Sequence, residues 1–161
     1  MQHEVATKEH EWLQQLVGEW SFEAASIVED GQPSITHAGT ESVRALGPLW
    51  VLCEGRTERA DGGADLTVMT LGFDATKQRF VGTFIGSMMS YLWVYEGTLD
   101  PSGTVLTLDC AGPSFEEGAG IVPYTDVIEL KGADQRVLWA QVQREDGTWH
   151  RFMTSNYRRT A

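Results

Sequence analysis

The spacing of apolar residues along the chain changes once, close to Gly18. Before that glycine, four apolar residues recur at the spacing of one helical face: Trp12, Leu13, Leu16 and Val17. This pattern predicts one short amphipathic helix over residues 7–17, which ends at Gly18. Thr7 is a suitable N-cap, and His10 stands where a capping box usually has Glu.

After Gly18, apolar and polar residues alternate, which is typical of strands that bury one face. About ten runs of this kind follow, over residues 20–28, 39–46, 49–59, 66–73, 79–85, 91–99, 105–110, 123–130, 136–144 and 149–159. Most are joined by short turns rich in Gly, Asp and Pro, including 29–33, 61–63 and 100–103, whereas 111–122 is predicted to be a loop. Short turns favour antiparallel pairing of consecutive strands, because parallel pairing requires long crossover connections.

A sheet of this many strands must curl or close on itself to protect its edges. The sequence therefore predicts an all-β protein, an up-and-down antiparallel barrel of about ten strands with a short N-terminal helix. A β-sandwich is the structural alternative, because two packed sheets give the same periodicity. We expect residues 1–161 to form a single domain, with strands over about 19–159.

The segment Gly18-Glu19-Trp20, placed directly after a short helix, resembles the Gly-x-Trp signature of the calycins, the superfamily of lipocalins and fatty-acid-binding proteins. In those barrels an arginine of the last strand packs over the tryptophan. The resemblance implies that Arg159 lies over Trp20 here and helps to close the barrel. Such a contact between a guanidinium and an indole is worth about 0.5–2 kcal/mol.

A closer resemblance is to a bacterial family catalogued as domain of unknown function 1579, which is expected to be lipocalin-like. The segments that carry it are LQQLVGEW (13–20), LGFD (71–74), FVGTF (80–84), SMM (87–89) and LWVYEGTL (92–99). The resemblance covers nearly the whole chain. It implies a fold but no activity.

A barrel of this size is wide enough to enclose a cavity for a small hydrophobic or amphipathic ligand. The residues predicted to bind such a ligand are Trp50, Glu54, Met69, Tyr91, Trp93, Tyr95 and Met153. Three aromatic residues among them alternate within one run and therefore share one face of a strand. For each residue of the set, a place in a solid core or on the outer face is the alternative.

Three other functions stay open. An isomerase or hydrolase could act on a small apolar substrate in the same cavity, with Glu54 as its base, provided that Glu54 faces inward. Nitrobindin-like barrels, another calycin-type group, hold haem through a histidine of a late strand, and His150 lies in the last run. A dimerising protein could expose the aromatic strand face, so both a monomer and a homodimer are considered. No phosphate-binding loop, dinucleotide fingerprint or nucleophile elbow is found, and no cofactor is predicted.

The composition limits the classes of partner that the protein is expected to bind and the cellular compartment in which it is expected. The net charge of −11, from 23 acidic and 12 basic residues, disfavours nucleic acids and anionic membrane surfaces. Without a secretory leader or an apolar stretch long enough to span a membrane, a cytoplasmic protein is expected.

Histidine and cysteine residues are too few and too scattered to predict a metal site. Surface exposure is expected for three of the histidines, His3, His10 and His37. Cys53 and Cys110 are expected to be reduced thiols, because they could pair only if their strands meet.

Overall fold

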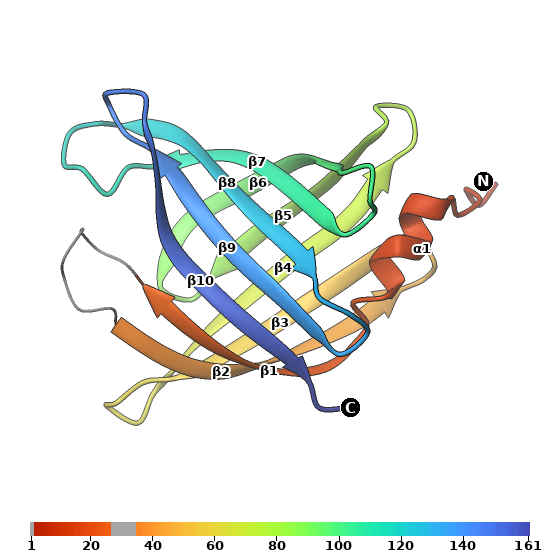
Figure 1. The fold of residues 1–161 in the computed structure, drawn as a ribbon, viewed down its shortest axis with the longest axis horizontal. Coiled ribbons are helices and arrows are strands. Elements are labelled where there is room, and N and C mark those ends of the chain that lie inside the picture. The colour runs from red at the N-terminus through yellow and green to blue at the C-terminus, as the bar shows by residue number, and fades with distance from the viewer. Residues whose placement is uncertain (1, 27–34) are drawn as a thin grey trace.

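The computed structural model describes residues 2–26 and 35–161 as a closed antiparallel barrel of ten strands with one helix at its end (Figure 1). The helix is α1 (Lys8–Gln14). The strands are β1 (Gly18–Ser26), β2 (Ile35–Leu46), β3 (Trp50–Glu58), β4 (Ala64–Asp74), β5 (Arg79–Gly86), β6 (Met89–Leu99), β7 (Val105–Pro113), β8 (Ile121–Leu130), β9 (Gln135–Gln143) and β10 (Trp149–Arg159).

Each strand pairs with its neighbours in the sequence, and β1 closes the ring by pairing with β10. The predicted up-and-down barrel is confirmed, and the β-sandwich alternative is excluded, because all ten strands are hydrogen-bonded in one continuous ring and not in two separate sheets. The turn predicted at 29–33 and the end of the run 20–28 lie outside the described residues.

Strand boundaries differ from the prediction at the start of β2, which begins at Ile35 and not at 39, and on both sides of the loop between β7 and β8. These two strands continue into the predicted loop as far as Pro113 and Ile121, which are partners across the ladder. Pro113 has no N–H to donate to the ladder, and it is tolerated because it is the last residue of its strand. The loop is therefore shorter than predicted, and a backbone hydrogen bond of 2.9 Å from Ser114 to Gly120 closes it.

The N-terminus of α1 is held by a histidine that sequence reasoning placed at the surface. His10 accepts a hydrogen bond from the backbone N–H of Thr7 through Nδ1 (2.9 Å), and its Nε2 lies 2.9 Å from the carbonyl oxygen of Phe73 on β4. The expected exposure of His10 is therefore wrong, since both ring nitrogens are used in a buried position. In the described part of the chain, no helix has the length and apolar character needed to cross a membrane.

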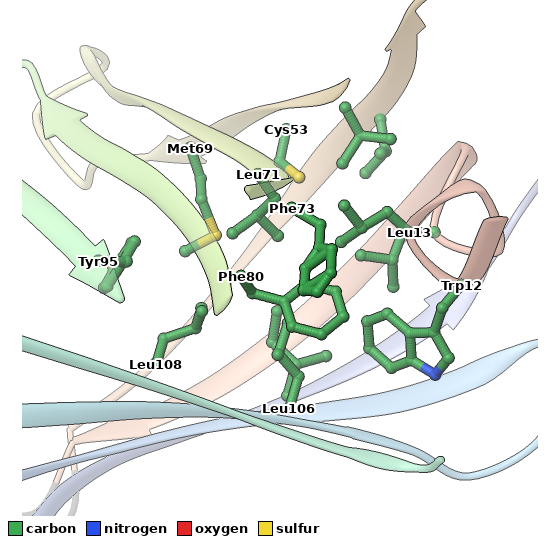
Figure 2. Close-up of a cluster of buried hydrophobic side chains, with 14 of the residues drawn as sticks. Trp12, Leu13, Cys53, Met69, Leu71, Phe73, Phe80, Tyr95, Leu106 and Leu108 are labelled. Carbon is green, nitrogen blue, oxygen red and sulfur yellow. The ribbon is translucent and has the colours of Figure 1, made fainter. Parts of the chain in front are cut away.

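The half of the barrel next to α1 is filled with apolar side chains. Figure 2 shows Trp12 and Leu13 of the helix facing Phe73, Phe80 and other buried side chains of the strands. The indole N–H of Trp12 donates to the carbonyl of Gly103 at 2.6 Å, which fixes α1 to the turn between β6 and β7. The helix thereby covers this end, and the larger cavity lies in the other half of the barrel.

The first and last strands meet near the closed end through Trp20 and Arg159. The two residues are partners in the ladder, and the guanidinium carbon lies 4.3 Å from the centroid of the Trp20 ring. The ring is buried, and its N–H donates to the carbonyl of Leu16 at 2.9 Å. The structure thus places these two residues in the contact that the resemblance to calycins implied.

Candidate functional site

The half of the barrel away from α1 contains a cavity of about 1560 Å³ that is open to solvent. It extends to the turn between β3 and β4, at the barrel end opposite the helix (Figure 1). Small-molecule sites commonly have volumes of about 300–1,000 Å³, so this space can hold an organic ligand. Apolar atoms supply most of its surface, although polar side chains are as numerous in the wall; the apolar residues include Phe22, Ala24, Met69, Phe84, Leu138, Phe152 and Met153.

A β-bulge in β10 increases the number of side chains that face the cavity. The register between β10 and β9 shifts between Arg151 and Met153. His150 lines the cavity before the shift and Met153 lines it after the shift, together with Phe152 in the bulge itself. Strict alternation would turn Met153 to the opposite face from His150. The bulge therefore brings three side chains of one short segment to the same wall.

Polar side chains gather at the inner end of the cavity. Glu41 from β2 and Ser155 and Tyr157 from β10 line this end. The Glu41 carboxylate forms an ion pair and a hydrogen bond with Nη2 of Arg136 on β9. The Arg136 guanidinium lies 3.9 Å from the centroid of the Tyr157 ring and 4.6 Å from that of Trp20. Arg136 is only 4% exposed beneath these rings, whereas the Glu41 side chain keeps 12% of its surface exposed.

Two buried polar atoms of this inner group lack a hydrogen bond of normal geometry among the described residues: Nε of Arg136 and Oγ of Ser155, although Ser155 also interacts with the Tyr157 side chain. Ser155 is 3% exposed and yet lines the cavity. Buried polar atoms are nearly always paired, so a hydroxyl that lacks a regular hydrogen bond at a cavity wall marks a place where a ligand or water can bind. Burial, with a smaller effect of the Glu41 charge, raises the pKa of Tyr157, so its hydroxyl keeps its proton.

The outer part of the cavity carries charges of both signs. Arg59 makes ion pairs there with Asp65 (2.8 Å) and Asp61 (3.2 Å). Other ionisable residues at this level are His37, Glu58, Glu116, Arg144 and His150. The outer part of the cavity therefore presents no single sign of charge.

Of the residues predicted to bind a ligand, Met69 and Met153 line the cavity. Trp50 and Glu54 lie instead on the outer face of β3, where 39% of Trp50 is exposed. Val51, between them in the sequence, is fully buried. The residues of β3 predicted to face inward therefore face outward, and their neighbours in the sequence face inward.

The outward position of Glu54 also removes it as a base inside the cavity. Its carboxylate forms an ion pair of 3.0 Å with Arg44, and 48% of its side chain is exposed. A carboxylate in this position is solvated and lies on the other side of the sheet from the cavity. The hypothesis that Glu54 acts as a catalytic base inside the cavity is therefore wrong.

The three predicted aromatic residues of β6 occupy the wall behind the cavity lining. Tyr91 and Trp93 are in edge-on contact at 5.0 Å, and Tyr95 is buried. Trp93 also contacts Tyr124 of β8 at 4.9 Å, and Tyr124 contacts the cavity residue Phe152 at 5.9 Å. These rings lie inside the barrel and pack against residues that line the cavity. The aromatic face of β6 points inward, and the outer face of the same strand carries the exposed Leu92 and Val94 instead.

A second buried polar pair lies outside the residues that line the cavity. The Tyr95 hydroxyl donates to the Asp126 carboxylate at 2.5 Å. Burial raises the pKa of Asp126 to about 6, against the opposing effect of this hydrogen bond. The thiol of Cys110 is nearby, and burial followed by the Asp126 charge raises its pKa to about 12. Cys110 and Cys53 are both free thiols, and their strands, β7 and β3, are not neighbours in the barrel.

Sequence reasoning missed the inner group of Glu41, Arg136 and Ser155. One signal was present: in the run 136–144, Arg136 is in phase with Leu138 and the other inward-facing residues of β9. A charged residue at an inward position of a strand must be paired or must meet a ligand. Its partner could not be found from spacing, because Glu41 is 95 residues away in the sequence.

Comparison with known proteins gives a family and a fold. The family described as "Protein of unknown function (DUF1579)" matches residues 5–159. No curated protein matches the chain.

Two solved structures share the barrel. The crystal structure of Rv2717c from M. tuberculosis is 12% identical, with a TM-score of 0.66, and the alignment covers 98% of this chain and 100% of that one. The S-type phycobiliprotein lyase CPES from Guillardia theta is 13% identical, with a TM-score of 0.65, and the alignment covers 94% of this chain and 92% of that one. At such low identity these similarities establish the fold alone.

Proposed function

The chain belongs to the DUF1579 family, whose description assigns no activity, and we propose from the cavity that the protein binds a small amphipathic molecule inside its barrel. The observation that carries this proposal is a cavity of about 1560 Å³ with an apolar wall and a polar inner end. A barrel that served only as a rigid scaffold would gain stability by filling this space, because empty volume forfeits packing contacts.

The two parts of the cavity have different roles in binding. The apolar wall supplies affinity, since removing apolar surface from water contributes about 25 cal/mol for each Å². The inner polar group supplies orientation, because a ligand that enters with its apolar end first would leave Ser155 Oγ unpaired.

The test begins with native mass spectrometry of freshly purified protein, to detect a small molecule that copurifies with it. Binding of an uncharged hydrophobic fluorophore is then compared in two variants with the same substitution. Thr57→Trp puts an indole into the cavity that Thr57 lines, whereas Thr40→Trp puts one on the exposed outer face of β2. We expect Thr57→Trp to weaken binding by at least about tenfold and Thr40→Trp to leave it unchanged.

Two results would contradict the proposal. One is protein that neither carries a copurified molecule nor binds any hydrophobic fluorophore. The other is equal binding by the wild type and a folded Thr57→Trp variant, which would place the fluorophore outside the barrel.

Haem is a second candidate ligand, favoured by the position of His150. This residue lines the cavity together with the apolar Phe152 and Met153, so an imidazole and an apolar wall, the groups that haem requires, are both present. Titration with haemin should then give a Soret band that is lost in His150→Ala and kept in His3→Ala. If the band is the same in both variants, haem is not bound through His150.

A further inference from the structure

The inner end of the cavity favours one class of ligand over another. We propose that the polar end of the ligand is a hydrogen-bond donor without negative charge, an alcohol or an amine, bound by Glu41 and Ser155. This inference rests on the proposed binding function and specifies which amphipathic molecules the barrel accepts.

The Glu41 carboxylate has one oxygen directed to the protein and one available to a ligand. Oε1 takes the hydrogen bond from Arg136, as an ionised carboxylate that only accepts. Oε2 lies over Gly55 on the neighbouring strand, 4.0 Å from the position that a Cβ would occupy there. The Thr67 side chain covers Gly55 at this place, and Glu41, Gly55 and Thr67 all line the cavity, so Oε2 lies at the cavity wall beside the Thr67 hydroxyl. A donor group can therefore approach it.

The positive charge of this group is not presented to the cavity. Arg136 is 4% exposed, contacts the faces of Tyr157 and Trp20, and is paired with Glu41 through Nη2; its unpaired Nε is buried, and Arg136 is not among the residues that line the cavity. A ligand carboxylate at the inner end would meet the Glu41 carboxylate without gaining a free cation. Like charges removed from water repel each other strongly, so the arrangement discriminates against anionic amphiphiles such as fatty acids.

Ser155 completes the site for a hydroxyl group. Its buried Oγ makes no hydrogen bond of normal geometry to the described residues and can donate or accept a hydrogen bond. An alcohol that donates to Glu41 can accept from Ser155 at the same time, which satisfies both groups. An amine can donate to both oxygens.

The experiment compares three twelve-carbon probes that differ only in their polar end: dodecan-1-ol, dodecylamine and dodecanoate. Each displaces a bound uncharged fluorophore below its critical micelle concentration, in about 150 mM salt to screen the net charge of the protein. We expect the alcohol and the amine to bind at least about tenfold more tightly than dodecanoate. Glu41→Gln should reduce the ratio of amine to dodecanoate affinity by at least about tenfold, and Glu54→Gln, the same charge change on the outer face, should leave it unchanged.

Glu41→Gln leaves the buried Arg136 without its ion-pair partner, and this variant could fail to fold for that reason. A second variant therefore tests the inference independently. Ser155→Ala removes a hydroxyl that makes no hydrogen bond of normal geometry to the described residues and creates no unpaired charge, so the barrel should fold, and the affinity for dodecan-1-ol should fall severalfold. Tighter or equal binding of dodecanoate would overturn this inference and leave the proposed function standing. If none of the probes displaces the fluorophore, the proposed function fails as well.

Discussion

The guanidinium of Arg159 lies over the ring of Trp20 and also holds the chain that leads out of α1. Its Nη1 donates to the carbonyl of Val17 at 2.6 Å, and its Nη2 donates to that of Gln15 at 2.8 Å. Its Nε donates to the carbonyl of Ala133 at 3.1 Å, in the turn between β8 and β9. One side chain of the last strand therefore joins the first strand, the helix exit and a neighbouring turn.

Replacement of this side chain should destabilise the barrel. Arg159→Ala removes one cation–π contact and the hydrogen bonds to three carbonyl groups, so the free energy of unfolding should fall by about 2–4 kcal/mol. Urea unfolding followed by tryptophan fluorescence measures this change. Arg158→Ala, at an exposed neighbouring position, should change it by less than about 0.5 kcal/mol. Equal effects of both substitutions would show that Arg159 does not join these segments.

The fold could be predicted because its signals are local. Alternation within each run and Gly-rich turns between runs define consecutive antiparallel strands, and a sheet of this size must close. The phase of β3 was predicted wrongly because the apolar Trp50 and Leu52 begin its outer face, although Glu54, Arg56 and Glu58 continue the same face and Val51 and Cys53 lie on the inner one. Gly55, which also faces inward, adds no side chain to the pattern.

The inner polar group of the cavity depends on the closed barrel. Glu41 and Arg136 belong to β2 and β9, which are separated in the ring by β1 and β10. Their side chains meet across the interior and not along a strand ladder. No local spacing encodes such a contact, so the sequence could indicate only that an inward-facing charge needs a partner.

His10 should contribute to stability more than its place in a short helix suggests. His10→Ala leaves the carbonyl of Phe73 and the backbone N–H of Thr7 without the ring nitrogens that they contact. Losing two such partners in a buried position should lower the free energy of unfolding by about 2–4 kcal/mol. Thermal unfolding of His10→Ala and of the exposed control His3→Ala provides the measurement. A melting temperature of His10→Ala within one degree of the wild type would contradict this role.

Asp126 should make the stability of the protein depend on pH. Burial raises its pKa from 3.8 to about 6, above the value in the unfolded chain. The contribution of Asp126 to stability is therefore complete below about pH 4 and is lost as the pH rises through about 6. This difference in pKa corresponds to at most about 3 kcal/mol.

Asp126→Asn should remove the loss of stability that accompanies the rise in pH. In urea unfolding, the wild type should lose more stability than the variant between pH 4 and pH 7, by up to about 3 kcal/mol. Glu96→Gln, on the exposed outer face of β6, should behave as the wild type. The same pH dependence in Asp126→Asn and the wild type would show that Asp126 is not the group responsible.

The two thiols should react slowly in the folded protein. Burial raises the pKa of Cys110 to about 12 and that of Cys53 further. Because the thiolate is the reactive form, a pKa of about 12 in place of about 9 reduces its population at pH 8 by about three orders of magnitude. Ellman's reagent should therefore modify the native protein at least about a thousandfold more slowly than the protein unfolded in urea. Cys53→Ala and Cys110→Ala assign the two rates, and Cys110, which is only partly buried, should be the faster. Rapid modification of Cys53 at the rate of a free thiol would contradict its position in the closed half of the barrel.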